Sequence, residues 1–465
     1  MNSRIKKGIT YVFIANMLTL IINILTNFLL PKYMSIDTYA AVKTFQLYMN
    51  YIGVFHLGFI DGIYLRYGGK SFQDISIHSL GDSISTARIF QFAIMAGMVS
   101  TALLLNNPIL VFFSLAIFPI NIVSYYRMLF QAVGEFGLYR KITNYTTICT
   151  FGINIFLLLV IKSDDYYQYL SGYIIVYILV WCLLEIYACR RLKICISFIF
   201  DKTEFARNIQ TGFFLMCGNF ATFLLSSMDR LFVKANLDNY AFAQYSFAVS
   251  LENMLNLAIT PITIPLYNYF CIEKKESRIR FAHDCICLFS SFLISSAFVA
   301  KFVVELYLPQ YVSSCTVIFL LFGGQAFQFI VKAVYINLYK ADKRQKTYFI
   351  KLSTIILLGA VLNHICFSIM GTKESFAVGT LLCSVFWCFL SFVDYLFLRI
   401  KMREIVYLLL EVTLFIVAGH FCNSICGLFI YLLGTVALSA LFMKNVVTYV
   451  IYKAYNILLC RRNIL

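Results

Sequence analysis

The sequence predicts an all-α, polytopic membrane protein with about fourteen transmembrane helices, arranged as two six-helix lobes in a parallel pseudo-repeat plus two C-terminal helices. The first observation behind this fold class is composition. Of the 465 residues, 61% are hydrophobic and only 13% are charged, whereas soluble domains average about 45–50% apolar and about 25% charged residues. The second observation is the spacing of apolar runs, and the third is the distribution of Lys and Arg between loops.

Apolar runs long enough to cross a bilayer, which takes about 20 residues, recur along the whole chain. The first run has no small-residue cleavage site after it, so we expect a retained helix and not a signal peptide. The connections are short, and even the longest hydrophilic gaps are too small to fold as catalytic domains. The expected spans lie at about 9–30, 39–60, 86–105, 108–130, 142–161, 168–188, 209–232, 242–266, 284–306, 313–337, 348–370, 376–398, 404–421 and 427–447.

The basic residues test this count independently, because cytoplasmic loops of membrane proteins carry an excess of Lys and Arg. If the N-terminus and every second loop share one side, that side holds most of the 38 basic residues. The sequence therefore predicts an even number of spans with both termini cytoplasmic. The net charge of +16 then reflects topology, and no nucleic-acid partner is expected. The opposite side holds only Lys32, Lys43, Lys162, Arg230, Lys234, Lys301 and Lys373.

An internal repeat indicates how the helices are grouped. The motif Asp-x-Tyr-Ala begins at Asp37 after the first expected span and again at Asp238 after the seventh. Six helices separate the copies, and an even number preserves orientation, so the halves form parallel repeats. We therefore expect an N-terminal lobe at residues 1–200, a C-terminal lobe at 201–400, and an extra helix pair with a cytoplasmic tail at 401–465.

Basic residues in the outer half of the membrane are candidates for binding an anion. Lys43 lies about one turn below the outer end of the second span, Arg230 lies at the outer end of the seventh, and Lys234 lies just beyond. Since basic residues are disfavoured on this side, their presence indicates a cavity that attracts a phosphate or diphosphate. The alternative is a scatter of side chains that reach the headgroups.

Polar residues also recur on single helix faces. Asn16, Asn23 and Asn27 are seven and four residues apart in the first span, and Glu252 and Asn256 are four apart in the eighth. Such spacing places each set on one face. The two faces either hydrogen-bond to neighbouring helices or line a cavity that offers donors and acceptors to sugar hydroxyls.

Two titratable residues are candidates for coupling transport to protons, because ionisable groups within spans are costly and usually functional. Glu252 is expected near the midplane, and His364 is expected to be buried in the eleventh span. Four other ionisable residues are expected to reach water or headgroups from cytoplasmic helix ends. These are Asp61, Glu185, Lys332 and Asp394.

Other chemistry is not indicated. Cys285 and Cys287 lie beside His283 and Asp284, but no second ligand pair follows at a zinc-like spacing, so neither a metal nor a cofactor is expected. The fifteen cysteines are interpreted as small hydrophobes with free thiols. No phosphate-binding loop of the Walker type is present, which excludes direct ATP drive by this chain.

The segment from residue 226 to 270 resembles the polysaccharide-transporter branch of the multidrug/oligosaccharidyl-lipid/polysaccharide (MOP) exporter superfamily. Members typically have an Asp at the end of the seventh helix, here Asp229, then a short loop, an aromatic-Ala entry to the eighth helix, and a proline near its end, here Pro261 and Pro265. The first span, which ends at Pro31 before Asp37, is also similar. The resemblance covers the whole chain in architecture and about 80 residues in motif.

The resemblance implies a role like that of O-antigen flippases of the Wzx type. Such a protein moves an undecaprenyl-diphosphate-linked oligosaccharide across the bacterial inner membrane by alternating access, as one step of lipopolysaccharide or polysaccharide biosynthesis. Its partners are this lipid-linked substrate, membrane lipids, and polymerase or chain-length proteins of the same pathway. It is not an enzyme.

Two alternatives remain open. A multidrug antiporter of the same superfamily would need acidic residues deep in the N-terminal lobe, and the first six spans show none at mid-depth. A membrane-embedded polymerase would need a large outer loop with paired catalytic groups, and the loop lengths argue against it. Specificity for one sugar cannot be deduced from the chain.

Overall fold

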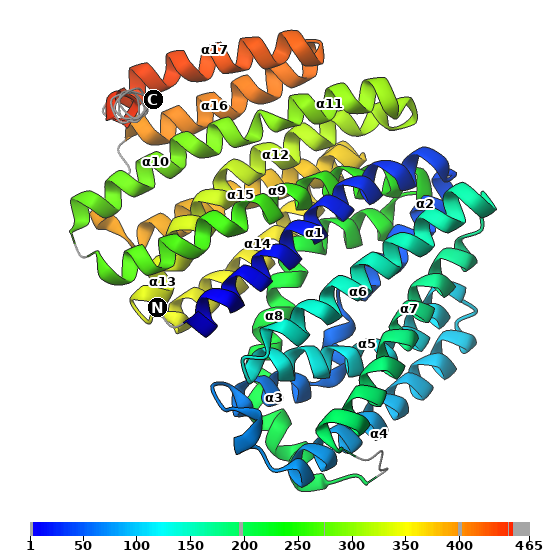
Figure 1. Cartoon of the computed structure of the whole chain (residues 1–465). Coiled ribbons are helices and arrows are strands. Elements are labelled where there is room, and N and C mark those ends of the chain that lie inside the picture. The colour runs from blue at the N-terminus through cyan, green and yellow to red at the C-terminus, as the bar shows by residue number, and fades with distance from the viewer. Residues whose placement is uncertain (1–2, 195–198, 274, 399–401, 445, 450–465) are drawn as a thin grey trace, which may run out of the picture. The chain divides into compact units, whose positions relative to one another are not determined.

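The computed structural model describes residues 3–194, 199–273, 275–398, 402–444 and 446–449, and all regular structure within them is helical (Figure 1). In this part of the chain, eleven helices are long and apolar enough to cross a membrane. The chain is therefore a multi-pass membrane protein. Every predicted apolar run overlaps a helix or a pair of helices.

The chain divides into two compact units. Unit 1 comprises Met1–Ser227 with Asp238–Ala243, and unit 2 comprises Met228–Leu237 with Gln244–Leu465. The change from one unit to the other lies within α8 (Lys202–Asn236) and again near the start of α9 (Asn239–Ile272). The three-part division of the chain at residues 200 and 400 stays a prediction, and residues 450–465 of its expected tail lie outside the described residues.

Unit 1 is built from seven complete helices and the first part of α8. Short polar motifs separate them: Asn107 caps the helix that begins at Pro108, since its side chain accepts a hydrogen bond from Leu110 N at 3.2 Å, as N-cap residues do. Asp165 caps the helix that begins at Tyr166 in the same way. The helices are α1 (Ser3–Tyr33), α2 (Ile36–Met49), α3 (Phe59–Tyr67), α4 (Ile77–Leu104), α5 (Pro108–Ala132), α6 (Phe136–Ile155) and α7 (Tyr166–Tyr187).

The expectation of one continuous second span is wrong. The chain runs through α2, a 3₁₀ turn at Ile52–His56, and then α3. Leu57 and Gly58 between them have φ of +48° and +87°, and left-handed residues end a helix. The run is apolar throughout, so hydropathy alone does not reveal the break.

The break allows a very close approach between α3 and α8 within unit 1. A Cβ added at Gly212 on α8 would lie 2.1 Å from Gly58 O and 2.2 Å from Gly62 N, and one added at Gly62 would lie 2.0 Å from Asn208 O. No side chain fits between these backbones. Glycine is therefore required here to let the two helices touch.

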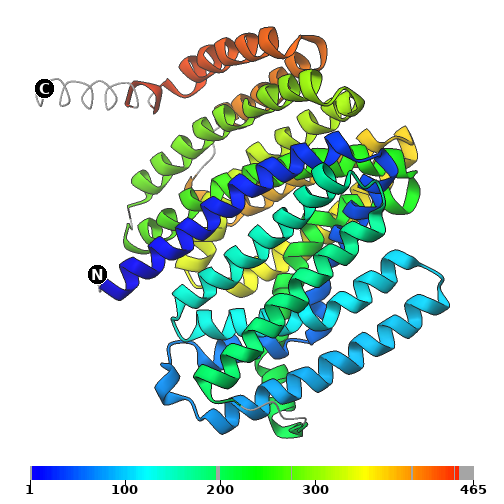
Figure 2. The same cartoon turned by 45° about the vertical axis from the view of Figure 1, so that its right-hand side comes forward.

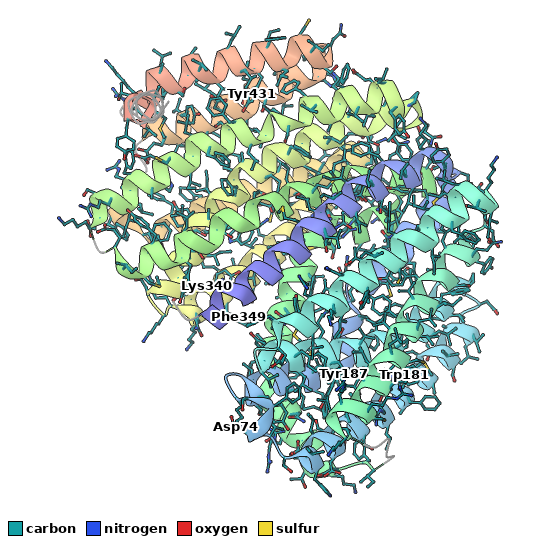
Figure 3. The ribbon with its side chains drawn as sticks, viewed as in Figure 1. Asp74, Trp181, Tyr187, Lys340, Phe349 and Tyr431 are labelled. Atoms are coloured by element: carbon teal, nitrogen blue, oxygen red, sulfur yellow. The ribbon has the colours of Figure 1, made fainter. Side chains whose placement is uncertain are left out.

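A buried ion pair lies in the core of unit 1. Arg88 of α4 donates from Nε to Glu185 Oε1 of α7 at 3.1 Å, and its Nη2 pairs with Glu185 Oε2. Tyr126 and Trp181 donate to the same carboxylate at 3.2 and 2.9 Å, and Trp181 lies on α7 with Tyr187 (Figure 3). The expectation that Glu185 reaches water or headgroups is therefore wrong.

Replacement of Glu185 by alanine should destabilise the protein by about 3–5 kcal/mol, because it leaves a buried guanidinium without its counter-charge. The measurement is thermal unfolding of the purified protein in detergent. The matched control is the double replacement Arg88→Leu with Glu185→Leu, which removes both charges and should cost much less. Equal losses in the single and double variants would contradict the assignment.

The core of unit 2 is a helical segment from Pro309 to Ala341. In its most apolar stretch of 18 residues, 89% of the residues are buried. Within it, α12 (Cys315–Ile330) continues through a π-helical turn at Val331–Tyr335 into α13 (Ile336–Ala341). The expected span at 284–306 is in fact two helices that meet at Ser295. The remaining helices are α10 (Glu276–Ile294), α11 (Ser296–Tyr307), α14 (Gln345–Met370), α15 (Lys373–Val393), α16 (Met402–Phe421) and α17 (Ser424–Phe442).

The last two helices form a pair. α16 and α17 lie side by side in both views (Figures 1 and 2) and pack against each other, while α16 also contacts α12 and α10. Lys301 of α11 donates to the backbone oxygens of Gly419 and Cys422, both at 2.8 Å, at the end of α16. Since unpaired carbonyls at a helix C-terminus attract a cation, Lys301 fixes the end of α16 to α11.

Candidate functional site

The structure brings together two of the residues predicted to form a site in unit 1. Lys43 of α2 is buried, with 5% of its surface exposed. Its Nζ lies 3.5 Å from Asn27 Oδ1 of α1 and 5.3 Å from the centre of the Tyr39 ring. The amide oxygen and the ring face both stabilise an ammonium group. An ammonium group is therefore held inside the apolar part of unit 1, where a basic side chain is costly.

The other asparagines of α1 are less defined. Asn23 lies one turn before Asn27 and is half-buried. The side chain of Asn16 lies outside the described residues. The predicted common face of the three asparagines is thus described for Asn23 and Asn27 only.

Unit 2 contains the second buried cation that the sequence singled out. Arg230 of α8 is 8% exposed, and its Nε atom has no hydrogen-bond partner among the described residues. The neighbouring Asp229 accepts from Arg230 N at 2.7 Å and from Tyr245 OH of α9 at 2.7 Å. Lys234, one turn later on α8, is half-buried. A buried guanidinium with an unused N–H is suited to an anionic ligand.

Glu252 lies in a network of polar side chains in unit 2. Its Oε1 accepts from Gln325 Nε2 of α12. Lys332 Nζ, from the π-helical turn after α12, donates to Asn256 Oδ1 at 2.7 Å and to Gln328 Oε1 at 2.9 Å. We call Glu252, Asn256, Gln325, Gln328 and Lys332 the α9–α12 polar cluster. It joins the two predicted residues Glu252 and Asn256 to a cation.

Sequence reasoning missed the α12 half of this cluster. Lys332 was expected to reach water from a cytoplasmic helix end, and that expectation is wrong, because its ammonium group is held by two amide oxygens beside α9. Gln325, Gln328 and Lys332 are three and four residues apart, which places them on one helix face. That spacing is visible in the sequence and was the available signal.

The expectation that His364 is buried is also wrong. The buried residues of α14 recur three or four positions apart and include Gly359, Asn363 and Cys366. Each residue of an α-helix is rotated by about 100° from the one before it, so His364 turns away from this face and is exposed. The preceding residue, Asn363, lies on the buried face of α14 and is 1% exposed.

Two further acidic residues have protein partners instead of contacts with headgroups. Asp61 of α3 is buried and accepts from Asn219 Nδ2 of α8 at 3.2 Å, with His56 Nε2 at 3.8 Å. Asp394 accepts from Tyr339 OH at 2.6 Å. The expectation for Asp61 is therefore wrong, and Asp394 has an additional role in fixing α13.

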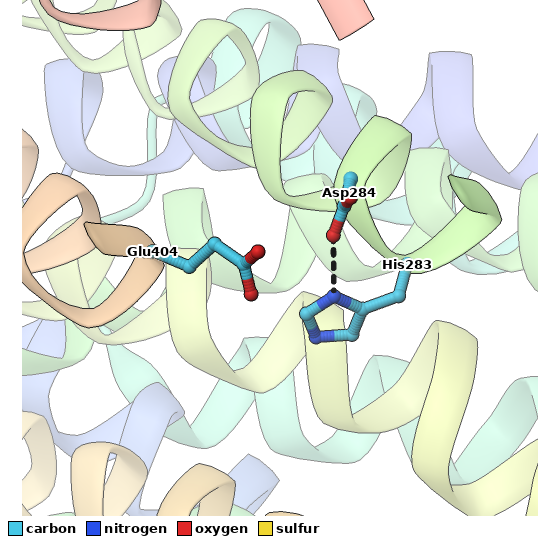
Figure 4. A group of neighbouring side chains, drawn as sticks. All are labelled: His283, Asp284 and Glu404. Carbon is cyan, nitrogen blue, oxygen red and sulfur yellow. Dashed lines mark hydrogen bonds and ion pairs between the residues drawn. The ribbon is translucent and has the colours of Figure 1, made fainter. Parts of the chain in front are cut away.

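One cluster has the residue types of a metal site (Figure 4). Ligand atoms of His283, Asp284 and Glu404 lie within 4.8 Å of one another. However, His283 Nδ1 pairs with Asp284 Oδ1 at 3.2 Å, and Glu404 Oε1 pairs with Arg280 Nη2 at 3.4 Å. Asp284 already has a hydrogen-bond partner in His283 and Glu404 has an ion-pair partner in Arg280, so these contacts account for the cluster.

The helix α9 contains both prolines of the motif that resembles the MOP superfamily. It runs without interruption from Asn239 to Ile272, so Pro261 and Pro265 do not break it.

The repeat motif has different surroundings in its two copies: Tyr39 is fully buried and Tyr240 is 46% exposed. Asp238 caps α9 by accepting from Ala241 N at 2.8 Å, whereas Ser35 takes this role at α2.

Comparison with known proteins defines the class of fold. No protein-family model matches the chain, and no curated protein matches it in sequence. Solved structures of transporters that include a multidrug resistance MATE family transporter of the MOP superfamily do match, at a TM-score of 0.51 and 14% identity, over 86% of this chain and 98% of that one. The chain thus has the fold of this class of membrane transporters.

Two further structures make the likeness more particular. The lipid II flippase MurJ, in an inward closed conformation, matches at a TM-score of 0.62 and 13% identity, over 95% of this chain and 99% of that chain. The eukaryotic MATE transporter AtDTX14 matches at a TM-score of 0.52 and 12% identity, over 88% of this chain and 98% of that chain. At these identities the likeness is one of fold.

Proposed function

We propose that this chain is a transporter that flips an undecaprenyl-diphosphate-linked oligosaccharide, such as an O-antigen repeat unit, from the cytoplasmic to the outer leaflet of the bacterial inner membrane. In this proposal the helices form two six-helix lobes and an extra pair, fourteen spans in all, with both termini cytoplasmic. Transport in this proposal is by alternating access. The chain carries no catalytic step of its own.

The extent of the fold match is the observation that carries the proposal. The two MATE structures are covered to 98% of their own lengths, yet they leave more than a tenth of this chain unmatched. That share is comparable to the part of the chain from α16 onward. The flippase structure is covered to 99% while 95% of this chain is matched. The larger share of this chain that the flippase fold matches therefore favours a lipid flippase over a drug transporter.

The buried cations support an anionic substrate headgroup. Arg230 has an unused N–H in unit 2, and Lys43 is buried in unit 1. In the proposal Arg230 and Lys234 of unit 2 bind phosphate oxygens, and Lys43 of unit 1 is a separate basic candidate, since guanidinium and ammonium groups recognise phosphate oxygens by charge-assisted hydrogen bonds. Asn16, Asn23, Asn27 and Asn256 then face the sugar, and the polyprenyl tail stays in lipid.

Energy for directional transport requires a coupled ion or the membrane potential, which is worth about 2.3 kcal/mol per elementary charge per 100 mV. Glu252 is the residue we propose for a proton cycle, because it lies in the α9–α12 polar cluster and the charges of Asp229 and Lys332 act on it. His364, the second coupling candidate from the sequence, is exposed and has a weaker case.

The test is the fate of the lipid-linked glycan in a strain that lacks this protein. We expect intermediates to accumulate in the cytoplasmic leaflet, where a periplasmic ligase cannot reach them, and to clear when the protein is expressed again. Normal surface glycan combined with altered drug tolerance would contradict the proposal and favour a multidrug antiporter. Accumulation of single flipped repeat units would instead indicate a polymerase.

A further inference from the structure

Besides Asp229, Glu252 and Glu404, a further acidic residue is buried in unit 2, away from the α9–α12 polar cluster. Glu411 of α16 is 1% exposed. Its Oε2 accepts from Thr435 Oγ1 of α17 at 3.0 Å, whereas Oε1 has no hydrogen-bond partner among the described residues. A buried carboxylate that is ionised and incompletely hydrogen-bonded is very costly, above all within a membrane. Something must therefore compensate Oε1.

The polar groups around Glu411 are all hydroxyls. Tyr407 of α16 and Tyr431 of α17 place their hydroxyls beside the carboxyl. Figure 3 labels Tyr431 on α17. Both tyrosines also bond Ser291 of α10: Tyr407 OH donates to Ser291 Oγ at 3.1 Å, and Tyr431 OH donates to Ser291 O at 2.7 Å. The contact with α12 is apolar, through Gly323 and Val412.

No charged side chain among the described residues acts on Glu411 or forms an ion pair with it. Glu404, which belongs to the cluster in Figure 4, lies seven residues earlier on α16, about 10 Å along the helix at 1.5 Å per residue. Compensation by a basic side chain is thus absent from this part of the chain. The simplest species that neutralises Oε1 is a proton.

Polar groups connect Glu411 to one end of these helices. His283, Cys287 and Ser291 are four residues apart on α10, and such spacing defines one helix face. Cys287 Sγ lies 3.8 Å from His283 Nδ1. On the facing side of α16, Glu404, Tyr407 and Glu411 are three and four residues apart, so they also share one helix face. We call this interface the α10–α16 polar face; it begins at the Arg280–Glu404 pair.

We propose that Glu411 is a proton-binding site within the α16–α17 pair, and that it exchanges its proton along the α10–α16 polar face with the side of the membrane that carries Arg280 and Glu404. The proton moves between water and Glu411 Oε1, and Thr435 keeps its hydrogen bond to Oε2 in both states. Ser291 and Tyr407 are positioning residues that orient the carboxyl. The site is separate from Glu252 and does not depend on the identity of the substrate.

Labelling with dicyclohexylcarbodiimide tests the site without any transport assay, because this reagent reacts with protonated carboxyl groups in apolar surroundings. The purified full-length protein is treated at a series of pH values, and the labelled peptides are identified by mass spectrometry. We expect Glu411 to be labelled at about pH 6 and labelling to fall roughly tenfold as the pH is raised. Glu411→Gln should lose this label and stay folded, since Gln resembles the neutral acid.

The matched control is Glu374→Gln, which removes a carboxylate from the first turn of α15, outside the α10–α16 polar face, and should leave labelling of Glu411 intact. Absence of label on Glu411 at every pH in folded wild-type protein would overturn the proposal, whether or not the Gln variant folds. Protection of Glu411 by sodium, at a pH where potassium gives none, would also overturn it by assigning a metal cation in place of the proton.

Vesicles with a different pH on each side test the route. Labelling of Glu411 is expected to follow the pH of the side that carries Arg280 and Glu404, and to ignore the pH of the other side. Labelling that follows the opposite side would refute the α10–α16 polar face as the path. Neither result depends on whether the protein flips a lipid.

Discussion

Replacement of Arg230 by alanine is expected to slow flipping of a diphosphate-linked oligosaccharide by about 10- to 100-fold, the equivalent of one or two charge-assisted hydrogen bonds. The reason is that Arg230 is a buried cation with an N–H free of hydrogen bonds among the described residues. The measurement is transfer of a fluorescent polyprenyl-diphosphate glycan between leaflets of proteoliposomes. Combination with Lys43→Ala should reduce flipping further.

Two variants control for charge and for folding. Arg230→Lys keeps the charge without the bidentate geometry and should give an intermediate rate. Arg278→Ala removes an exposed arginine of unit 2 that pairs with Glu273 at 2.9 Å, and it should leave flipping unchanged. If Arg230→Ala and Arg278→Ala flip equally well as folded proteins, Arg230 does not bind the headgroup.

Replacement of Gly212 by alanine is expected to destabilise the protein by about 3 kcal/mol or more, at the upper end of the usual cost of overpacking. The added Cβ would lie 2.1 Å from Gly58 O and 2.2 Å from Gly62 N, and these are backbone atoms that cannot move alone. The measurement is thermal unfolding, with size-exclusion chromatography to count folded protein.

Gly218→Ala is the matched control for that experiment, because it lies on the same helix and a Cβ there meets nothing within 4 Å. It should be neutral or stabilising by roughly 0.5–1 kcal/mol, since alanine favours helix over glycine. Similar behaviour of Gly212→Ala and Gly218→Ala would contradict the close contact between α3 and α8.

The positions of the helices were predictable because hydropathy is a local property. Every expected span overlaps a helix or helix pair, and the resemblance to a transporter superfamily agrees with the fold match. The break after Met49 was not predictable from hydropathy, because the run is apolar throughout. The break allows a contact between backbones more than 150 residues apart in sequence, those of Gly58 and Phe213. Hydropathy carries no information about such a contact.

The orientation of side chains was harder to predict than their depth. His364 was placed in the correct helix but on the wrong face, since a shift of one residue rotates a side chain by about 100°. Lys43 and Asn27 were singled out separately, one as a basic residue and one on an asparagine face, and their contact of 3.5 Å between Nζ and Oδ1 was not predicted. Lys332 was misassigned because its partners lie on α9 and α12, and pairing between helices is invisible to a depth count.

The π-helical turn at Val331–Tyr335 has a consequence for how this chain could have evolved. Such a turn corresponds to the insertion of one residue into an ordinary helix, and here the inserted turn contains Lys332. Deletion of a single residue would restore the regular helix and rotate everything after it by about 100°. Asn337 would lose Thr263 O, and Tyr339 would lose Asp394. An ancestor without the insertion would thus have lacked the present contacts of α13 with Thr263 and Asp394.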